Sequence, residues 1–284
     1  MYRIVEKQDL APAIKEIVVE APHVARKARA GQFVIVRLDE PGERIPLTIA
    51  DHDPARGTVT LVVQEVGKTT MQMGAMSVGE ALATVAGPLG HPTEIAAYGR
   101  VICVGGGVGI APIFPIAREL REAGNRVVSI IGARSHDLLF WEDRMRAVSD
   151  ELIVCTDDGS YGRHGLVTEP LRELLEQHPG EFARVWAIGP GIMMKFVSAT
   201  TQPFGVPTTV SLNTVMIDGT GMCGGCRVVA HGGAQFVCVD GPEFDGWQVD
   251  WDLLLSRLQY YRPQEAEAVA QWQRGSCHAE EVTG

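Results

Sequence analysis

The sequence has no apolar run of the roughly 20 residues that a membrane span needs. Its first residues, Met1–Asp9, hold no apolar run of signal-peptide length, and internal repeats and low-complexity segments are lacking. Positive charge is scarce, because 25 Lys and Arg stand against 35 Asp and Glu, for a formal charge of −10. This balance disfavours nucleic acid and anionic membranes as partners. We expect a cytoplasmic protein that binds neither.

Motifs of hydrolytic catalysis are missing too. The sequence contains no Gly-x-Ser-x-Gly and no His-Glu-x-x-His, and its 8 histidines are scattered. Only 6 cysteines occur in 284 residues, too few for a disulfide scaffold and in keeping with a reducing compartment. Cys103, inside an apolar strand, is expected in the core, and Cys277, in the polar tail, is expected to have no role.

Three of the cysteines belong to one spacing, D-x4-C-x2-C-x11-C, which runs from Asp218 to Cys238. Plant-type [2Fe–2S] proteins use C-x4-C-x2-C with a distant fourth cysteine. Glycines between these residues allow a tight loop around a small cage. The predicted cluster ligands are Asp218, Cys223, Cys226 and Cys238.

Two other interpretations of this stretch stay open. Three cysteines and an aspartate can hold zinc, and a Cys-x-x-Cys pair can be a redox dithiol. Zinc sites usually complete one Cys-x2-Cys with a second close pair, which is absent from this stretch. A dithiol leaves Cys238 and Asp218 unexplained.

Residues 1–97 predict an antiparallel β-barrel. Short β-rich runs such as Ile14–Glu20, Phe33–Arg37 and Val59–Val63 follow one another without helices between them. The motif Arg44-Ile45-Pro46-Leu47-Thr48 offers a guanidinium fork for phosphate and a hydroxyl for a flavin. Gly67–Thr70 adds amides, hydroxyls and a cation suited to a pyrophosphate. Alone, the first motif is more typical of a surface arginine at a strand start.

From residue 98 the pattern changes to strands that alternate with helices, which predicts a parallel sheet. The expected strands are Arg100–Val104, Val127–Ile131, Glu151–Cys155 and Val185–Ile188. The first ends in a glycine-rich turn, Gly105 to Pro112, which opens a helix over residues 113–123. The turn is neither the G-x-G-x-x-G fingerprint nor a Walker A loop, yet its free amides can bind phosphate. A purely structural turn is the alternative.

Further candidates lie at the carboxyl ends of the later strands. Cys155 ends the third strand and is either a buried core residue or a neighbour of a nicotinamide. Arg134 and Arg144 follow the second strand, where they either hold a 2′-phosphate or lie exposed. After the cysteines, an apolar helix is expected over Trp247–Tyr261. It either covers its own domain or forms a docking surface.

The order of these features resembles the ferredoxin–NADP reductase superfamily. It looks most like the branch that holds the small subunit of NADH-dependent ferredoxin–NADP oxidoreductase and the dihydroorotate dehydrogenase electron-transfer subunit. Asp218 in the place of a cysteine favours the former. The resemblance implies FAD, a [2Fe–2S] cluster and NAD(P)H as the groups bound. It assigns FAD to Arg44, Pro46, Leu47, Thr48, Gly67, Lys68, Thr69 and Thr70, and NAD(P)H to Gly105, Gly106, Gly107, Val108, Gly109, Gly189, Pro190 and Met193, with Met194 beside it.

We therefore expect an oxidoreductase subunit that passes electrons between NAD(P)H, FAD and the cluster and a larger catalytic partner, with ferredoxin as a further partner. The expected parts are a FAD-binding barrel (1–97), an NAD(P)-binding α/β domain (98–207), a cluster-binding segment (208–246) and a helical tail (247–284). The rival hypothesis is a module that senses redox state through a cluster or zinc without turnover.

Overall fold

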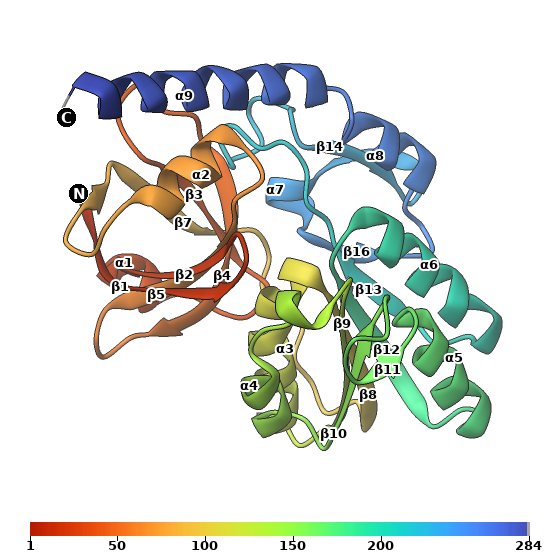
Figure 1. Ribbon diagram of the computed structural model, residues 1–284. Helices are drawn as coiled ribbons and strands as arrows, with labels where there is room; N and C mark the ends of the chain where they lie inside the picture. Colours follow the sequence, from red (N-terminus) through yellow and green to blue (C-terminus); the bar gives the residue numbers. More distant parts are fainter. Residues whose placement is uncertain (283–284) are drawn as a thin grey trace.

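The computed structural model describes the backbone of residues 1–282 and the side chains of residues 1–274, so Cys277 lies outside the described side chains. Two seven-stranded sheets stand side by side, and a smaller unit and two helices join them at one end (Figure 1). No helix in the described part of the chain is long and apolar enough to span a membrane.

The first sheet is the expected barrel, with the strand order β6-β1-β2-β5-β4-β3-β7 and antiparallel pairing throughout. The predicted runs Ile14–Glu20 and Phe33–Arg37 are strands with those same bounds. The sequence pattern missed α2, in the stretch read as a phosphate-binding loop. The elements are β1 (Tyr2–Ala11), β2 (Ile14–Glu20), α1 (Pro22–Ala25), β3 (Phe33–Arg37), β4 (Ile45–Asp53), β5 (Thr58–Gln64), α2 (Lys68–Ala75), β6 (Ala81–Leu82) and β7 (Thr84–Leu89).

The second sheet has the order β11-β10-β9-β8-β12-β13-β16, parallel except for its edge strand β16. All four expected strands are present, and the first helix begins three residues earlier than expected, at Ile110. The elements are β8 (Arg100–Gly106), η1 (Gly107–Gly109), α3 (Ile110–Glu122), β9 (Arg126–Ala133), η2 (His136–Leu138), α4 (Glu142–Ala147), β10 (Glu151–Thr156), β11 (Arg163–His164), α5 (Thr168–Gln177), β12 (Phe182–Ile188), α6 (Gly191–Thr201), η3 (Gln202–Phe204) and β13 (Thr208–Ser211).

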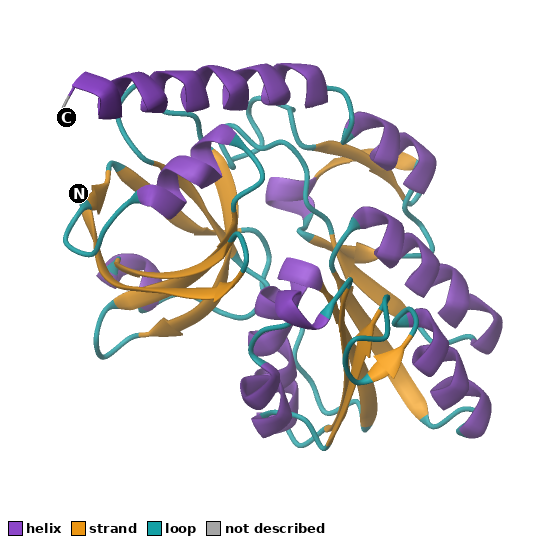
Figure 2. Ribbon diagram, viewed as in Figure 1, coloured by secondary structure: helices purple, strands orange, loops and turns teal. Residues whose placement is uncertain are grey.

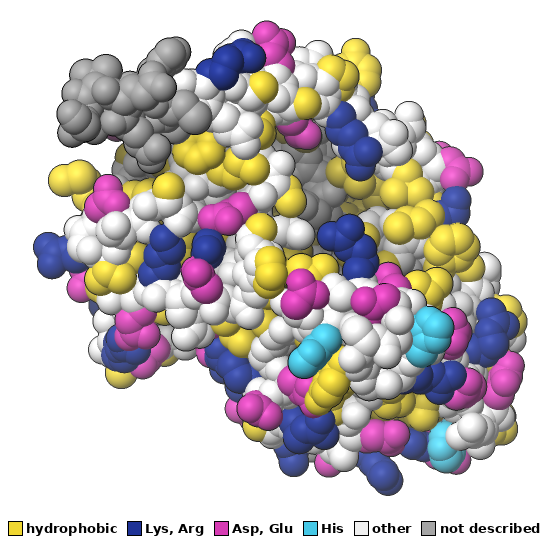
Figure 3. Space-filling view, viewed as in Figure 1, with side chains coloured by type: hydrophobic (Ala, Val, Ile, Leu, Met, Phe, Trp, Pro, Cys, Tyr) yellow, Lys and Arg dark blue, Asp and Glu magenta, His cyan; other side chains and the backbone are white. Residues whose placement is uncertain are grey.

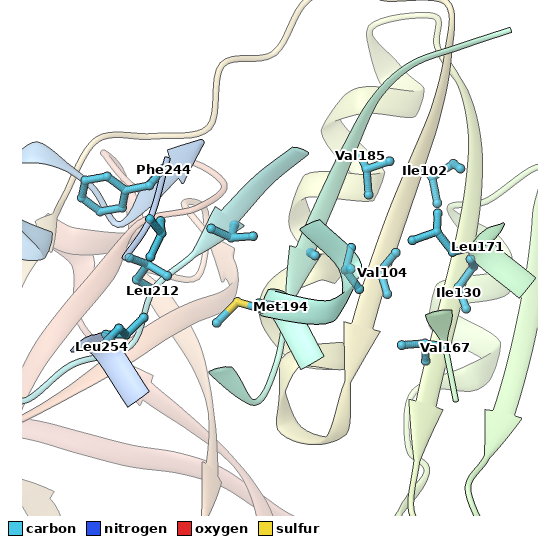
Figure 4. Close-up of a cluster of buried hydrophobic side chains, with 14 of the residues drawn as sticks. Ile102, Val104, Ile130, Val167, Leu171, Val185, Met194, Leu212, Phe244 and Leu254 are labelled. Atoms are coloured by element: carbon cyan, nitrogen blue, oxygen red, sulfur yellow. The ribbon is translucent and has the colours of Figure 1, made fainter. Parts of the chain in front are cut away.

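Helices cover both faces of this sheet, α3 and α4 on one side and α5 and α6 on the other (Figure 2). The strands are therefore apolar on both faces, as buried parallel strands are. On β8, Val101 and Cys103 enter the core under α3, while Ile102 and Val104 enter the core under α5 and α6 (Figure 4). Cys103 is a core residue, as expected.

The chain after β13 builds the smaller unit. A two-stranded sheet of β14 (Arg227–Ala230) and β15 (Gly233–Phe236) leads into α7 (Val237–Asp240), and the chain then returns to the large sheet as β16 (Glu243–Asp245). The expected tail helix is shorter than predicted, α8 (Trp251–Arg257), and it begins later because Asp250 caps it by accepting a hydrogen bond from the Leu253 amide. The last helix, α9 (Arg262–Val282), runs back over the barrel and contacts α2 (Figure 1).

A polar network fixes the barrel to the α/β part. The Asp51 carboxylate of β4 accepts hydrogen bonds from Arg118 of α3 and Arg144 of α4. The Arg144 guanidinium also lies 3.9 Å from the Trp141 ring centroid, and the Trp141 indole donates to Glu16 of β2. Arg144 thus serves the contact between the two sheets, while Arg134 is exposed.

Candidate functional site

A cavity of about 270 Å³ lies where the barrel, the parallel sheet and the cysteine-bearing segment meet. Most of its wall is apolar, and a few hydroxyl and amide groups interrupt it, as is typical of cofactor sites. The lining residues are Phe33, Ile45, Pro46, Leu47, Thr48, Ala50, Val62, Gln64, Val66, Thr70, Val108, Gly109, Ala111, Pro112, Ile188, Gly189, Ser211, Leu212, Asn213, Met216 and Pro242.

The barrel wall of the cavity carries the predicted flavin motif. Pro46, Leu47 and Thr48 all line it, and Thr48 pairs with Phe33 across β4 and β3. Arg44 directly precedes β4 and is exposed beside this wall. Side-chain ion pairs within the described part of the chain involve neither Arg44 nor Lys68, which leaves both cations available to an anion.

The second predicted patch forms the start of α2. Gly67 is the N-cap, and no acidic residue lies in the first turn. The Thr70 hydroxyl lines the cavity and accepts hydrogen bonds from the amides of Gly67 (3.0 Å) and Val66 (3.1 Å). Thr69 is buried and donates to the Glu43 carboxylate at 2.5 Å. Both hydroxyls therefore hold the loop in place, and Lys68 and the helix N-terminus are the parts of the patch suited to a phosphate.

The glycine-rich turn between β8 and α3 forms the facing wall. Val108, Gly109, Ala111 and Pro112 line the cavity. A Cβ on Gly109 would lie 2.2 Å from the Ile188 carbonyl oxygen, so no side chain fits there. Gly107 has φ +55 and open space around it, which favours glycine on conformational grounds alone.

The structure brings this turn together with the second predicted nucleotide segment. A Cβ on Gly106 would lie 2.2 Å from the Met193 sulfur, and one on Gly189 would lie 2.9 Å from the Gly106 carbonyl oxygen. Two turns that are far apart in the sequence thus touch backbone to backbone at the cavity. Pro190 is exposed beside them, Met193 is partly buried and Met194 is in the core.

Cys155 lies away from the cavity wall. Its side chain is 1% exposed and belongs to the core under α5. Burial raises the pKa of its thiol to about 11, although Arg163 acts in the opposite direction. The thiol is therefore neutral at physiological pH, which favours the core interpretation.

The cysteine loop begins immediately beyond the cavity. Met216 lines the cavity, and Asp218 opens the loop two residues later. A Cβ on Gly219 (φ +75) would lie 2.8 Å from the Ile35 side chain of β3, so the loop packs directly on the barrel. This contact explains why both faces of β3 are buried: Val34 and Val36 fill the barrel core, whereas Phe33 and Ile35 face outward.

The four predicted ligands share this loop and the helix that follows it. The Asp218 carboxylate accepts hydrogen bonds from the amides of Thr220 and Cys223, both at 2.7 Å. These bonds, that from Thr220 foremost, lower the pKa of Asp218 and keep it ionised. Cys223 is exposed, whereas Cys226 and Cys238 are buried with their sulfurs 3.3 Å apart.

The buried pair has the spacing of two thiolates on one metal. Two sulfurs at about 2.3 Å from a tetrahedral metal ion lie within 4 Å of each other. Burial and the Cys226 thiol raise the pKa of Cys238 to about 12, so a cation is needed to hold both as thiolates. Within the described side chains, no three His, Cys, Asp or Glu residues converge on a single ion. Each iron of a two-iron cluster takes two donors from the protein, so three need not converge on one ion, and the chemistry of these four donors fits such a cluster.

The site also contains residues that the sequence did not single out. Ser211 ends β13, and Asn213 and Met216 lie between that strand and the cysteine loop. Gln64 ends β5, and Val66 follows it. The sequence signal that could have identified Ser211, Asn213 and Met216 was their position shortly before Asp218. The stretch predicted as the tail helix, Trp247–Tyr261, carries both buried and exposed apolar side chains. Leu254 is buried, while Leu253, Tyr260 and Tyr261 are exposed. Hydrophobic side chains gather over α6 and α8 in Figure 3, where Ile192 and Phe196 are also exposed.

The chain is similar to known proteins along most of its length. A family model for the iron-sulfur cluster binding domain of dihydroorotate dehydrogenase B matches residues 213–250. A dihydroorotate dehydrogenase B (NAD(+)) electron transfer subunit homolog from Thermotoga maritima is 50% identical over 265 residues, 93% of each chain. The electron transfer subunit of that enzyme from Desulforamulus reducens is 32% identical over 251 residues, covering 86% of this chain and 95% of that protein.

Solved structures agree with this relationship. A chain of the NADH-dependent reduced ferredoxin-NADP oxidoreductase, studied for flavin-based electron bifurcation, superposes with a TM-score of 0.91 at 48% identity. The match covers 96% of this chain and 98% of that one. Phthalate dioxygenase reductase, at 18% identity and a TM-score of 0.59, shares the fold. The expected fold class and superfamily are confirmed: the chain belongs to the family of dihydroorotate dehydrogenase B electron transfer subunits and their homologues, oxidoreductase subunits with a ferredoxin reductase-like fold.

Proposed function

We propose that this chain is the FAD- and [2Fe–2S]-containing electron-transfer subunit of an NAD(P)H:ferredoxin oxidoreductase. One observation carries the proposal: a single cavity is lined by the motif Pro46–Thr48, by the start of α3 and by Met216, which stands two residues before Asp218. A hydride donor, a flavin and a cluster would thus adjoin one another. The solved chain at 48% identity supports a ferredoxin-NADP oxidoreductase.

The residues present suit each group. Thr48 and the apolar wall would hold the flavin ring, and Arg44, Lys68 and the start of α2 would hold its pyrophosphate. The turn from Gly105 to Gly109, with Gly189, Pro190 and Met193, would receive NAD(P)H. When bound, these groups supply hydride transfer and one-electron transfer, and the protein supplies position and potential.

The cluster would lie at Asp218, Cys223, Cys226 and Cys238. The loop orients its donors before any metal binds, because two backbone amides fix the Asp218 carboxylate. Burial of Cys226 and Cys238 excludes water from one side of the site, while the exposed Cys223 leaves the other side open to a partner. Electrons would leave by that side.

A larger catalytic subunit is the proposed partner, with ferredoxin as a further one. The names of the relatives favour a second candidate, the electron-transfer subunit of a dihydroorotate dehydrogenase. We also propose the division into residues 1–97, 98–207, 208–246 and 247–284 for the parts binding FAD, NAD(P)H and the cluster and for the tail. A cytoplasmic location is supported by the five described cysteines, all of which are free thiols.

The purified chain provides the test. We expect one FAD and two iron atoms per chain, and bleaching of the flavin absorption on anaerobic addition of NADH or NADPH. Protein that contains zinc and no flavin would contradict the proposal and support the redox-sensing module instead.

A further inference from the structure

The Glu243 carboxyl lies where three parts of the chain meet. It stands on β16, and its Oε1 accepts a hydrogen bond from the hydroxyl of Thr93, in the segment that joins the two sheets (2.5 Å). On the barrel side, a Cβ on Gly31 would lie 3.1 Å from the same oxygen. The side chain is partly exposed. The carboxyl is thus enclosed on several sides, while the residue as a whole keeps some exposure to water.

Glu243 is also a neighbour of the cavity. In the antiparallel pair of β13 and β16 it stands directly opposite Ser211, and opposed residues project from the same face of a sheet. Ser211 lines the cavity, as does Pro242 beside Glu243. Glu243 therefore adjoins two residues of the cavity lining.

The surroundings of Glu243 bring the pKa of its carboxyl close to physiological pH. Burial raises the pKa of Glu243 to about 7, while the Thr93 hydroxyl, Arg184 and the Trp186 indole lower it by less. Arg184 forms no ion pair with it among the described residues. Its guanidinium lies over the rings of Tyr98 (5.2 Å) and Trp186 (5.7 Å) and 4.0 Å from the Glu94 carboxylate. Three other ionisable groups share this surrounding: Tyr98 and Glu94 from the joining segment and Cys103 from β8.

We propose that Glu243 binds a proton from water when the cavity gains the negative charge of a hydride, and returns that proton when the electrons leave. The inference rests on the proposed function. A hydride brings two electrons and one proton, so the cavity gains one negative charge, and the Glu243 carboxylate becomes a carboxylic acid. When two one-electron acceptors remove the electrons, the hydride's own proton and the proton on Glu243 both return to water.

The physical reason is the short distance through protein. A new charge in the cavity is poorly screened at a carboxylate that adjoins the cavity lining, and it raises the proton affinity of that carboxylate. A surface carboxylate is screened by water and stays ionised. Glu122, the last residue of α3, is exposed and forms no ion pair among the described residues, so it provides the matched control.

The test measures the flavin midpoint potential against pH from roughly pH 5.5 to 8.5, on both sides of the carboxyl's pKa of about 7, in the wild type, Glu243→Gln and Glu122→Gln. We expect the wild type and Glu122→Gln to show an additional pH-dependent segment that begins near pH 7. Glu243→Gln should lose it, and Glu243→Asp should shift it.

A second measurement does not depend on turnover. Infrared difference spectra between oxidised and reduced protein should show a protonated carboxyl band on reduction, absent in Glu243→Gln. If Glu243→Gln is flavin-loaded and has the wild-type pH dependence and the wild-type band, the inference is overturned while the proposed function stands. Wild-type protein that binds no flavin overturns both.

Discussion

The Asp218 carboxylate and the Cys223 amide are joined by a 2.7 Å hydrogen bond across the loop that carries both. The bond closes the stretch from Asp218 to Cys223 into a ring, so the Asp218 carboxylate is directed into the loop before a metal is bound. It also consumes one lone pair of one oxygen, and each oxygen keeps another. The aspartate can thus both shape the loop and bind iron.

Replacing Asp218 separates these two roles. Asp218→Cys should keep the cluster and change its reduction potential, because a thiolate replaces a harder oxygen donor. Cys223→Ala, Cys226→Ala and Cys238→Ala should each lose the iron. Iron content and the EPR spectrum of the reduced protein are the measurements. An Asp218→Ala protein with an unchanged spectrum and potential would show that another group is the fourth ligand.

Arg44→Ala should lower FAD occupancy and leave the cluster intact. Arg44 is exposed beside the cavity wall, and removal of a charge-assisted phosphate contact weakens binding by about 2 kcal/mol, or roughly thirtyfold. The measurement is the FAD-to-iron ratio after extensive dialysis. Arg134→Ala, which removes another exposed arginine, is the control. Stoichiometric FAD in Arg44→Ala would refute the assignment.

Gly109→Ala should weaken nucleotide binding and cost about 1–3 kcal/mol of stability. The added methyl group would lie 2.2 Å from the Ile188 carbonyl oxygen, so the two turns at the cavity must move apart. Gly233→Ala is the matched control, since a Cβ there meets nothing within 4 Å. Denaturant unfolding and NADH titration monitor the two effects. Wild-type NADH affinity in Gly109→Ala would argue against this turn as the nucleotide site.

Glu243 should make the stability of the flavin-free protein depend on pH. Its pKa rises from 4.5 in the unfolded chain to about 7 in the fold, so the folded state binds more protons between these values. The contribution of Glu243 to the free energy of unfolding should therefore fall as pH rises from 4.5 to 7, by about 3 kcal/mol, and stay level above that. Glu243→Gln should lack this fall. A constant difference between the two proteins across the range would disprove the shift.

The isolated subunit should reduce ferredoxin slowly. The cavity proposed for hydride exchange is lined by Met216, and the cluster loop begins two residues later, at Asp218. We expect NADH or NADPH to reduce the bound flavin rapidly and ferredoxin to be reduced efficiently only with a separate catalytic chain. Steady-state ferredoxin reduction by the subunit alone, compared with the reconstituted complex, measures this. Equal rates would exclude a required partner.

Prediction from the sequence worked where local patterns decide structure. Runs such as Phe33–Arg37 carry their own β-propensity and turn signals, and the cysteine spacing points to one chemistry. Contacts across the fold were missed for a physical reason. The roles of Arg144 and Glu243 depend on partners 93 and 150 residues away, Asp51 and Thr93, and no local pattern records those distances. The helix α2 was not predicted because glycine and threonine, which have low helix propensity, dominate its start.

The antiparallel pair of β13 and β16 has a mechanical consequence. The chain leaves the large sheet at Ser211 and rejoins it at Glu243, directly opposite, so the cluster loop is rooted at two adjacent points. A segment attached at one point can rotate about that point, whereas this segment can rotate only if hydrogen bonds between β13 and β16 break. Gly219, set against Ile35, is a third support. The distance between the cavity and the cluster loop should therefore stay constant during turnover, and any movement should be that of the partner.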